Sequence, residues 1–170
     1  MGAQSVAGAP ARAQVMARRL AAVAMILGSV GVVLGSLMPW AKVTLPLLGT
    51  RSTTGLDSGG DAVFCIAVGV AACLVGLRTL ISGGPSPTAA TERAVVALVG
   101  VLGVVCVVFA LLAARNVDSR LNSLFGSLPG FARSFVSGEI GAGIWVVAVG
   151  AAVVAVASLV QVLASAPSRG

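Results

Sequence analysis

The sequence predicts an all-α membrane protein, an up-and-down bundle of four transmembrane helices with a small extracytoplasmic cap. Four apolar stretches, near residues 20–39, 62–82, 94–114 and 140–164, carry no ionisable side chain in their central parts. Each is long enough to cross a bilayer, because about 20 helical residues span ~30 Å of hydrocarbon. The composition agrees, since the chain is 58% hydrophobic and 9% charged, whereas a typical soluble domain is about 25% charged.

Residues 1–19 precede the first apolar stretch and are expected to form a disordered, basic cytoplasmic tail. Arg12, Arg18 and Arg19 lie directly before the stretch, as in a signal peptide. The apolar run is longer than the usual core of ~7–15 residues and no A-x-A cleavage site follows it, so a retained helix is expected. Because basic residues favour the cytoplasmic side, both tails, including residues 165–170, are predicted to be cytoplasmic in a multi-pass protein of the inner (plasma) membrane.

The first outer loop, residues 41–60, predicts a short β-hairpin. Residues 42–45 and 50–54 are rich in strand-forming types, and the Pro-Leu-Leu-Gly sequence at 46–49 between them is typical of a turn. An isolated hairpin is marginally stable, so support from the bundle or from the second outer loop is expected. Asp61 and Glu139 precede the second and fourth apolar stretches, where a carboxylate is predicted to cap the helix.

The second outer loop, residues 115–139, contains apolar residues at helical spacing with polar residues between them. The pattern predicts an amphipathic helix of about three turns that stops near Pro129 and Gly130. This helix can lie on the outer leaflet, pack across the hairpin, or present its apolar face to a partner. The residues predicted to bind a partner are Leu121, Leu124, Phe125 and Leu128, together with Phe131 and Phe135 from the following segment.

Small residues recur on one face of each apolar stretch. Lipid provides no hydrophobic drive for helix association, so close backbone approach at small residues is expected to supply the packing. Packing within the chain is favoured over homodimerisation through the G-x-x-x-G pair at 31 and 35. The predicted helix-packing residues are Gly28, Gly31, Gly35, Gly69, Gly76, Gly100, Gly103, Ala148, Ala151 and Ala155.

Trp40 and Trp145 lie at the outer ends of the first and fourth apolar stretches. Tryptophan is enriched at the level of the lipid headgroups, so both are predicted to be interface anchors. A recognition surface on that side of the membrane is the alternative interpretation.

The sequence provides few groups that could carry chemistry. It has no histidine and no tyrosine, so no catalytic, cofactor-binding or metal site is predicted. Cys65 and Cys73 are separated by about 12 Å of helical rise and cannot bond to each other, whereas Cys106 could approach either. The thiols are expected to be small buried hydrophobes. The basic residues are scattered along the chain and form no stripe, so nucleic acid is not an expected partner.

Two resemblances concern the layout as a whole. Four helices, inner termini and a hairpin loop after Trp40 resemble the claudin-like tetraspan topology, but the cysteine pair of the claudin loop is missing and adhesion does not carry over. The motifs at 38–40, 54–61 and 141–145 are similar to those of small four-helix membrane proteins of high-GC Gram-positive bacteria. This resemblance implies a plasma-membrane protein of an actinobacterium and no particular activity.

The sequence thus favours a non-enzymatic accessory or scaffold protein that binds or stabilises a larger membrane or cell-envelope assembly through its outer face. The alternative is a homo-oligomeric small channel or transporter, with its pathway built between subunits. The expected partners are the lipid bilayer and either another membrane protein or a second copy of the chain.

Overall fold

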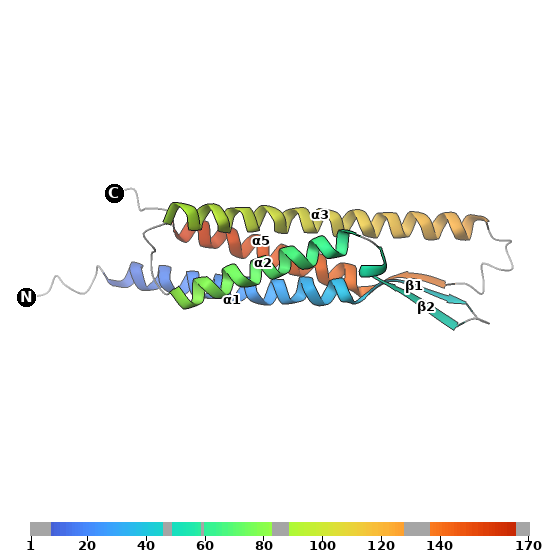
Figure 1. The fold of residues 1–170 in the computed structure, drawn as a ribbon, viewed down its shortest axis with the longest axis horizontal. Coiled ribbons are helices and arrows are strands. Elements are labelled where there is room, and N and C mark those ends of the chain that lie inside the picture. The colour runs from blue at the N-terminus through green and yellow to red at the C-terminus, as the bar shows by residue number, and fades with distance from the viewer. Residues whose placement is uncertain (1–7, 46–48, 59, 83–88, 128–136, 166–170) are drawn as a thin grey trace, which may run out of the picture.

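The computed structural model describes residues 8–45, 49–58, 60–82, 89–127 and 137–165. The helices lie side by side as a bundle, and a small sheet stands at one end of it (Figure 1). We call this the cap end, and we call the opposite end, where the first helix begins and the last one ends, the terminal end. The elements in chain order are α1 (Gly8–Leu37), β1 (Pro39–Leu45), β2 (Gly49–Thr54), the 3₁₀ helix η1 (Leu56–Ser58), α2 (Gly60–Ser82), α3 (Ala89–Ser127), β3 (Ser137–Ile140) and α5 (Ala142–Ala164).

Among the described residues, four helices are long and apolar enough to cross a membrane, at Arg12–Leu37, Gly60–Ser82, Ala90–Ser119 and Ala142–Ala164. α1 packs against α2 and α5, and α5 packs against α3, while α2 and α3 contact each other less extensively. The core contains the fully buried side chains Met25, Val32, Ile144 and Val147. The opposite faces of all four helices expose Val and Leu, as a lipid-facing surface would. The prediction of four packed helices that are long and apolar enough to cross a membrane is therefore confirmed.

α1 begins earlier than the sequence predicted. Residues 8–19 are helical, so the prediction of a disordered tail is wrong for that part, and residues 1–7 lie outside the described residues. The reason is local, because the segment consists largely of Ala, Arg, Gln and Met, which have high helix propensity. α1 ends at Leu37, two residues before Pro39, because proline lacks an N–H group and restricts the residue before it.

α3 is the longest element and corrects the prediction for residues 115–139. It runs for 39 residues, or about 58 Å by helical rise, so its last two turns or more extend past the hydrocarbon. The amphipathic segment is therefore the straight continuation of a membrane-spanning helix. No glycine or proline stands between Ala114 and Phe125 to stop it. The outer end of α3 projects past the ends of α1, α2 and α5 (Figure 1).

The cap is a three-stranded antiparallel sheet in the order β2-β1-β3. The predicted hairpin is confirmed, with Lys42 opposite Ser52 and Thr44 opposite Thr50, while its turn at 46–48 lies outside the described residues. β3 was not predicted, and it pairs with β1 so that Glu139 stands opposite Lys42. Glu139 is thus a strand residue and the prediction that it caps the last helix is wrong, since α5 has Gly141 as N-cap without a side-chain bond. Asp61 lies in the first turn of α2, at the positive end of the helix dipole.

Candidate functional site

Trp40 fixes the sheet to the bundle. It is the second residue of β1, and its side chain is only 3% exposed. The indole Nε1 donates a hydrogen bond to the backbone oxygen of Gly35, at 3.0 Å. Trp40 was predicted to be an interface anchor, but the structure encloses its ring in protein, where it fixes the sheet to the bundle. Trp145, on α5, is 52% exposed, and its role at the headgroups stays a prediction.

Three glycines allow this enclosure. A Cβ atom at Gly55 would lie 2.6 Å from Trp40 Cε2, and one at Gly143 would lie 2.8 Å from Trp40 Cδ1. At Gly141 a Cβ atom would lie 2.0 Å from the backbone oxygen of Pro39, while its own N–H donates to the oxygen of Trp40 at 2.7 Å. The start of α5 and the start of β1 are consequently held backbone to backbone. The sequence offered no signal for the contacts of Gly141 and Gly143, because they join residues about 100 positions apart.

Asp57 closes the turn between β2 and α2. Its Oδ2 accepts hydrogen bonds from Thr54, from the backbone N at 2.9 Å and from Oγ1 at 2.8 Å. These two hydrogen bonds, of which the one from the backbone has the larger effect, hold the pKa of the Asp57 carboxyl below its ordinary value. The carboxylate therefore orders the connection that leads from the sheet back into the membrane.

At the cap end, β2 is one edge of the sheet, and α3 contacts β3 at the opposite edge. β2 is an edge strand, and its residues are exposed from Gly49 to Thr53. An edge strand presents unpaired backbone groups, which is the surface that strand addition uses. Of the residues predicted to bind a partner, Leu121, Leu124 and Phe125 lie in the last turns of α3, and Leu128, Phe131 and Phe135 lie outside the described residues. Val117, one turn earlier, packs against the core.

The interior of the bundle contains few polar side chains, and most of them bond to their own helix. The hydroxyls of Ser29, Ser36 and Ser158 donate to the backbone oxygens of Ile26, Val32 and Val154, each at 2.8 Å. Gln161 is 3% exposed, and its Nε2 has no hydrogen-bond partner among the described residues. The hydroxyl protons of these serines are thus already donated to carbonyl groups of the same helix, so they are not available to a solute.

The predicted small residues lie at the helix contacts. Gly28 and Gly35 of α1 meet α5 near Gly150 and Val147, while Gly69 and Gly76 of α2 meet α1, and Gly100 and Gly103 of α3 meet α5. Gly31 is less tightly enclosed, since a Cβ atom there would lie 3.6 Å from the Cα of Gly150. On α5, Ala151 is buried and Ala148 and Ala155 are half-buried.

α2 and α3 meet toward the cap end through two pairs of side chains. The rings of Phe64 and Phe109 are in edge-to-face contact, with centroids 5.7 Å apart. The thiols of Cys65 and Cys106 are within hydrogen-bonding reach of each other. Cys73 is half-buried, and all three cysteines are free thiols. Their burial is consistent with small core residues.

Polar contacts gather at the terminal end, where three helices meet. Arg78 of α2 and Glu92 of α3 form an ion pair at 3.5 Å. The Nη2 of Arg93 donates to the backbone oxygen of Ser165, and Ser165 Oγ donates to the oxygen of Gln161 at 2.7 Å. Arg93 thereby caps the C-terminal end of α5, whose last carbonyls lack helical partners.

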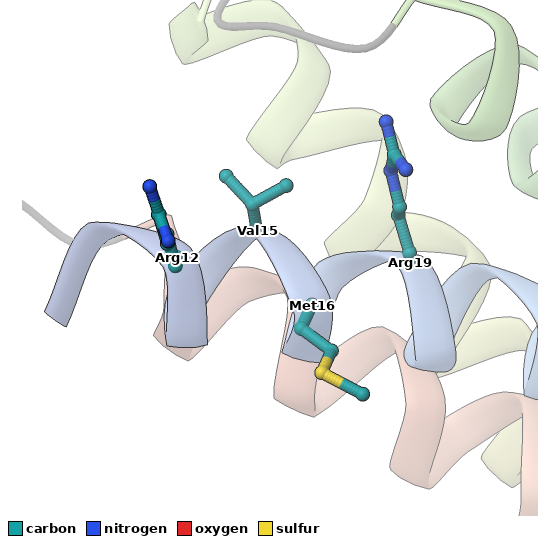
Figure 2. A pocket seen from close by; sticks show the side chains of 4 residues that line it. All are labelled: Arg12, Val15, Met16 and Arg19. Atoms are coloured by element: carbon teal, nitrogen blue, oxygen red, sulfur yellow. The ribbon is translucent and has the colours of Figure 1, made fainter. Parts of the chain in front are cut away.

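A shallow hollow of about 360 Å³ lies on the first turns of α1, lined by Arg12, Val15, Met16 and Arg19. Figure 2 shows the two arginine side chains on the same side of the helix as Val15, one on each side of it. These residues precede the stretch predicted as the first membrane helix. The hollow combines guanidinium groups with exposed apolar side chains.

Comparisons of the chain with family models, with curated proteins and with solved structures find no match. The described residues contain no group of three or more His, Cys, Asp or Glu side chains placed to hold a metal ion.

Proposed function

We propose that this chain is a non-enzymatic accessory protein of the plasma membrane, which binds or stabilises a larger membrane or cell-envelope assembly through its cap. One observation carries the proposal: the cap is held firmly to the bundle and projects from it. Trp40 and Gly141 join the sheet to α1 and α5 through buried backbone contacts. A surface positioned in this way can hold a partner at a fixed height above the membrane.

The bundle interior supports an accessory role over transport. A carrier or channel needs polar groups that can replace the hydration of its solute. In the described part of the bundle the buried serine hydroxyls bond to carbonyls of their own helices. The helices themselves meet at glycines, with almost no space between backbones. A pathway between subunits remains the competing function, and the experiment below distinguishes the two.

The docking surface that we propose is the exposed edge of β2 together with the outer end of α3. The edge of β2 carries Arg51 and no acidic residue, so the complementary partner is an extended segment with an acidic side chain opposite Arg51. Leu121, Leu124 and Phe125 lie on α3, which contacts the opposite edge of the sheet at β3, and we propose that they make a second, apolar contact with the same partner. Burial of a large apolar side chain is worth about 1.5–3 kcal/mol, so α3 should contribute most of the binding free energy.

The test is purification of the native protein in mild detergent, followed by mass spectrometry of the proteins that accompany it. The variant is Leu121→Ser with Phe125→Ser, and the control on the same helical segment is Asn116→Ala with Ser119→Ala, both exposed positions. We expect the first variant to keep the thermal stability of wild type and to lose the accompanying proteins, while the control keeps them.

Three other outcomes would contradict the proposal. Loss of monomer stability in the serine variant would mean that this face packs on its own chain. Unchanged accompanying proteins would remove the end of α3 from the function. A homo-oligomer that conducts a solute after reconstitution into liposomes would favour the channel or transporter.

A further inference from the structure

The hollow on α1 has the chemical character of a binding site for an anionic lipid. Arg12 and Arg19 are seven residues apart, or roughly 10 Å along the helix axis, and Figure 2 shows them on either side of Val15. Val15 is 48% exposed and Met16 is 64% exposed. In Figure 2 Val15 lies between the two arginine side chains and Met16 extends away from them. Exposed apolar side chains beside exposed guanidinium groups suit a molecule that has both an anionic and an apolar part.

The position of the hollow along the bundle is that of the headgroup layer. α1 has 30 residues, or about 45 Å of helix, compared with ~30 Å of hydrocarbon. Gly76 of α2 packs against Ala22 of α1, so the end of α2, six residues later at Ser82, is level with about Met16. The turns around Arg12 therefore lie where the neighbouring membrane helix is ending.

The terminal end of the bundle carries mainly positive charge. Within the described residues the terminal end carries Arg12, Arg18, Arg19, Arg78 and Arg93, and the acidic side chain there is Glu92, which is paired with Arg78. Arg93 donates to the end of α5. Among the described residues, the arginines of α1 form no ion pair. Guanidinium groups bind phosphate oxygens with two parallel hydrogen bonds, which favours a phosphate partner.

We propose that this face of α1 binds an anionic phospholipid, with Arg12 and Arg19 as the phosphate ligands and Val15 and Met16 in contact with the glycerol region and the first methylenes of the acyl chains. A soluble phosphate would use the arginines but would gain nothing from the exposed Val15 and Met16. The proposal is independent of the function assigned to the cap, because the two surfaces lie at opposite ends of the bundle (Figure 1).

The test is native mass spectrometry of the detergent-purified full chain, titrated with phosphatidylglycerol or phosphatidylcholine. The variant Arg12→Gln with Arg19→Gln is compared with the control Lys42→Gln with Arg115→Gln, which removes the same charge at exposed cap-end positions. Each basic residue near a headgroup is worth about fivefold in affinity, so the first variant should bind phosphatidylglycerol roughly twentyfold more weakly. The control should stay within about twofold of wild type.

Further variants separate lipid binding from other causes. Val15→Asn with Met16→Asn keeps the charge and should also weaken phosphatidylglycerol binding, and Arg12→Lys with Arg19→Lys should retain most of it and shows that the segment still folds. Inorganic phosphate should not displace the lipid. Displacement by phosphate with an unaffected asparagine variant would assign the site to a soluble anion and overturn the proposal. Equal losses in the arginine variant and the cap-end control, or no loss in either, would overturn it as well.

Discussion

Replacement of Gly35 with alanine should destabilise the protein, whereas the same change at Gly31 should not. A Cβ atom at Gly35 would lie 2.7 Å from the backbone N of Val147 and 2.9 Å from the backbone oxygen of Gly143. Both neighbours are backbone atoms of α5, which cannot rotate away. To reach an ordinary contact of 3.4 Å, α1 and α5 would have to separate locally by 3.4 minus 2.7, or about 0.7 Å.

The magnitude follows from the difference between the two variants. Overpacking of this kind costs about 1–3 kcal/mol, and the rigid backbone contact places Gly35→Ala toward the upper part of that range. Alanine gains about 1 kcal/mol of helix propensity over glycine at either position. Because this gain is common to both variants, the difference between their free energies of unfolding isolates the overpacking cost. Gly31→Ala has an ordinary contact of 3.6 Å and should be neutral or stabilised.

The assay is unfolding in mixed micelles by titration with a denaturing detergent, monitored by tryptophan fluorescence. Trp40 is a suitable reporter, since it is buried and bonded to Gly35 itself. Gly28→Ala, which would place Cβ 2.8 Å from the backbone oxygen of Gly150, should resemble Gly35→Ala. Equal stabilities for the Gly31 and Gly35 variants would refute the close contact between α1 and α5 at Gly35.

Three other predictions can be tested with single substitutions. The pKa of Asp57 is lowered in the folded state, so its contribution to stability is present above the pKa of the unfolded chain and is lost as the pH falls through the folded-state pKa. Asp57→Asn should remove this loss of stability from acid unfolding curves. An unchanged curve would mean that the hydrogen bonds from Thr54 do not persist. Gln161→Leu should raise stability by about 1 kcal/mol or more, because a buried amide donor without a partner carries a desolvation cost, and a destabilised variant would show that the amide is bonded. For the orientation with cytoplasmic tails, Gln14→Cys should resist an impermeant thiol reagent in intact cells while Ser52→Cys reacts, and labelling in the opposite sense would reverse the assignment of sides.

The spans of the membrane helices could be predicted from the sequence because the determinant is local. Length and the absence of central charges suffice to identify a segment that crosses hydrocarbon, and the four helices follow that pattern. The glycines at the helix contacts could also be predicted, because they recur at helical spacing. What the pattern could not provide is the pairing of the helices. It gave no means to separate Gly35 from Gly31, which differ by 0.9 Å in the nearest approach to α5 (3.6 minus 2.7).

The two boundary errors have a common physical cause. Residues 8–19 and 115–127 are polar enough to leave the membrane, and that polarity suggested a tail and a loop. Polarity reports where a segment lies and says little about whether the helix continues. Helix continuation depends on propensity and on the absence of breakers next to the membrane, and residues 11–19 and 115–125 contain neither glycine nor proline. Without a glycine or proline at the membrane boundary, the backbone bonds already formed in lipid make the next turn favourable, since propagation is easier than nucleation.

The misassignment of Trp40 has a different cause. A tryptophan at the end of an apolar stretch is usually an interface anchor, and the residue itself carries no sign that a strand will fold it inward. The burial depends on Gly55 and Gly143 at distant positions, and on β3, which pairs with β1 across more than 90 residues of chain. Such contacts are fixed only when the helices have assembled. The cap was thus predictable as a hairpin that needs support from the bundle or the second loop, whereas the particular contacts that provide this support were not.

α1 connects the two surfaces that we propose to be functional. Its packing therefore determines how far a movement at one surface is transmitted to the other. Its first turns carry Arg12 and Arg19, and its last turn leads within three residues to Trp40. Between them α1 contacts α5 through glycine backbones at Gly28 and Gly35, so it has no side chains there that could absorb a shift. A lipid that changes the tilt of α1 would therefore have to move α5 with it, and Gly141 would carry the sheet along. Loosening this contact by Gly35→Ala should uncouple the cap from a lipid bound at the first turns of α1, whereas loss of Arg12 and Arg19 should leave the position of the cap unchanged when no lipid is bound.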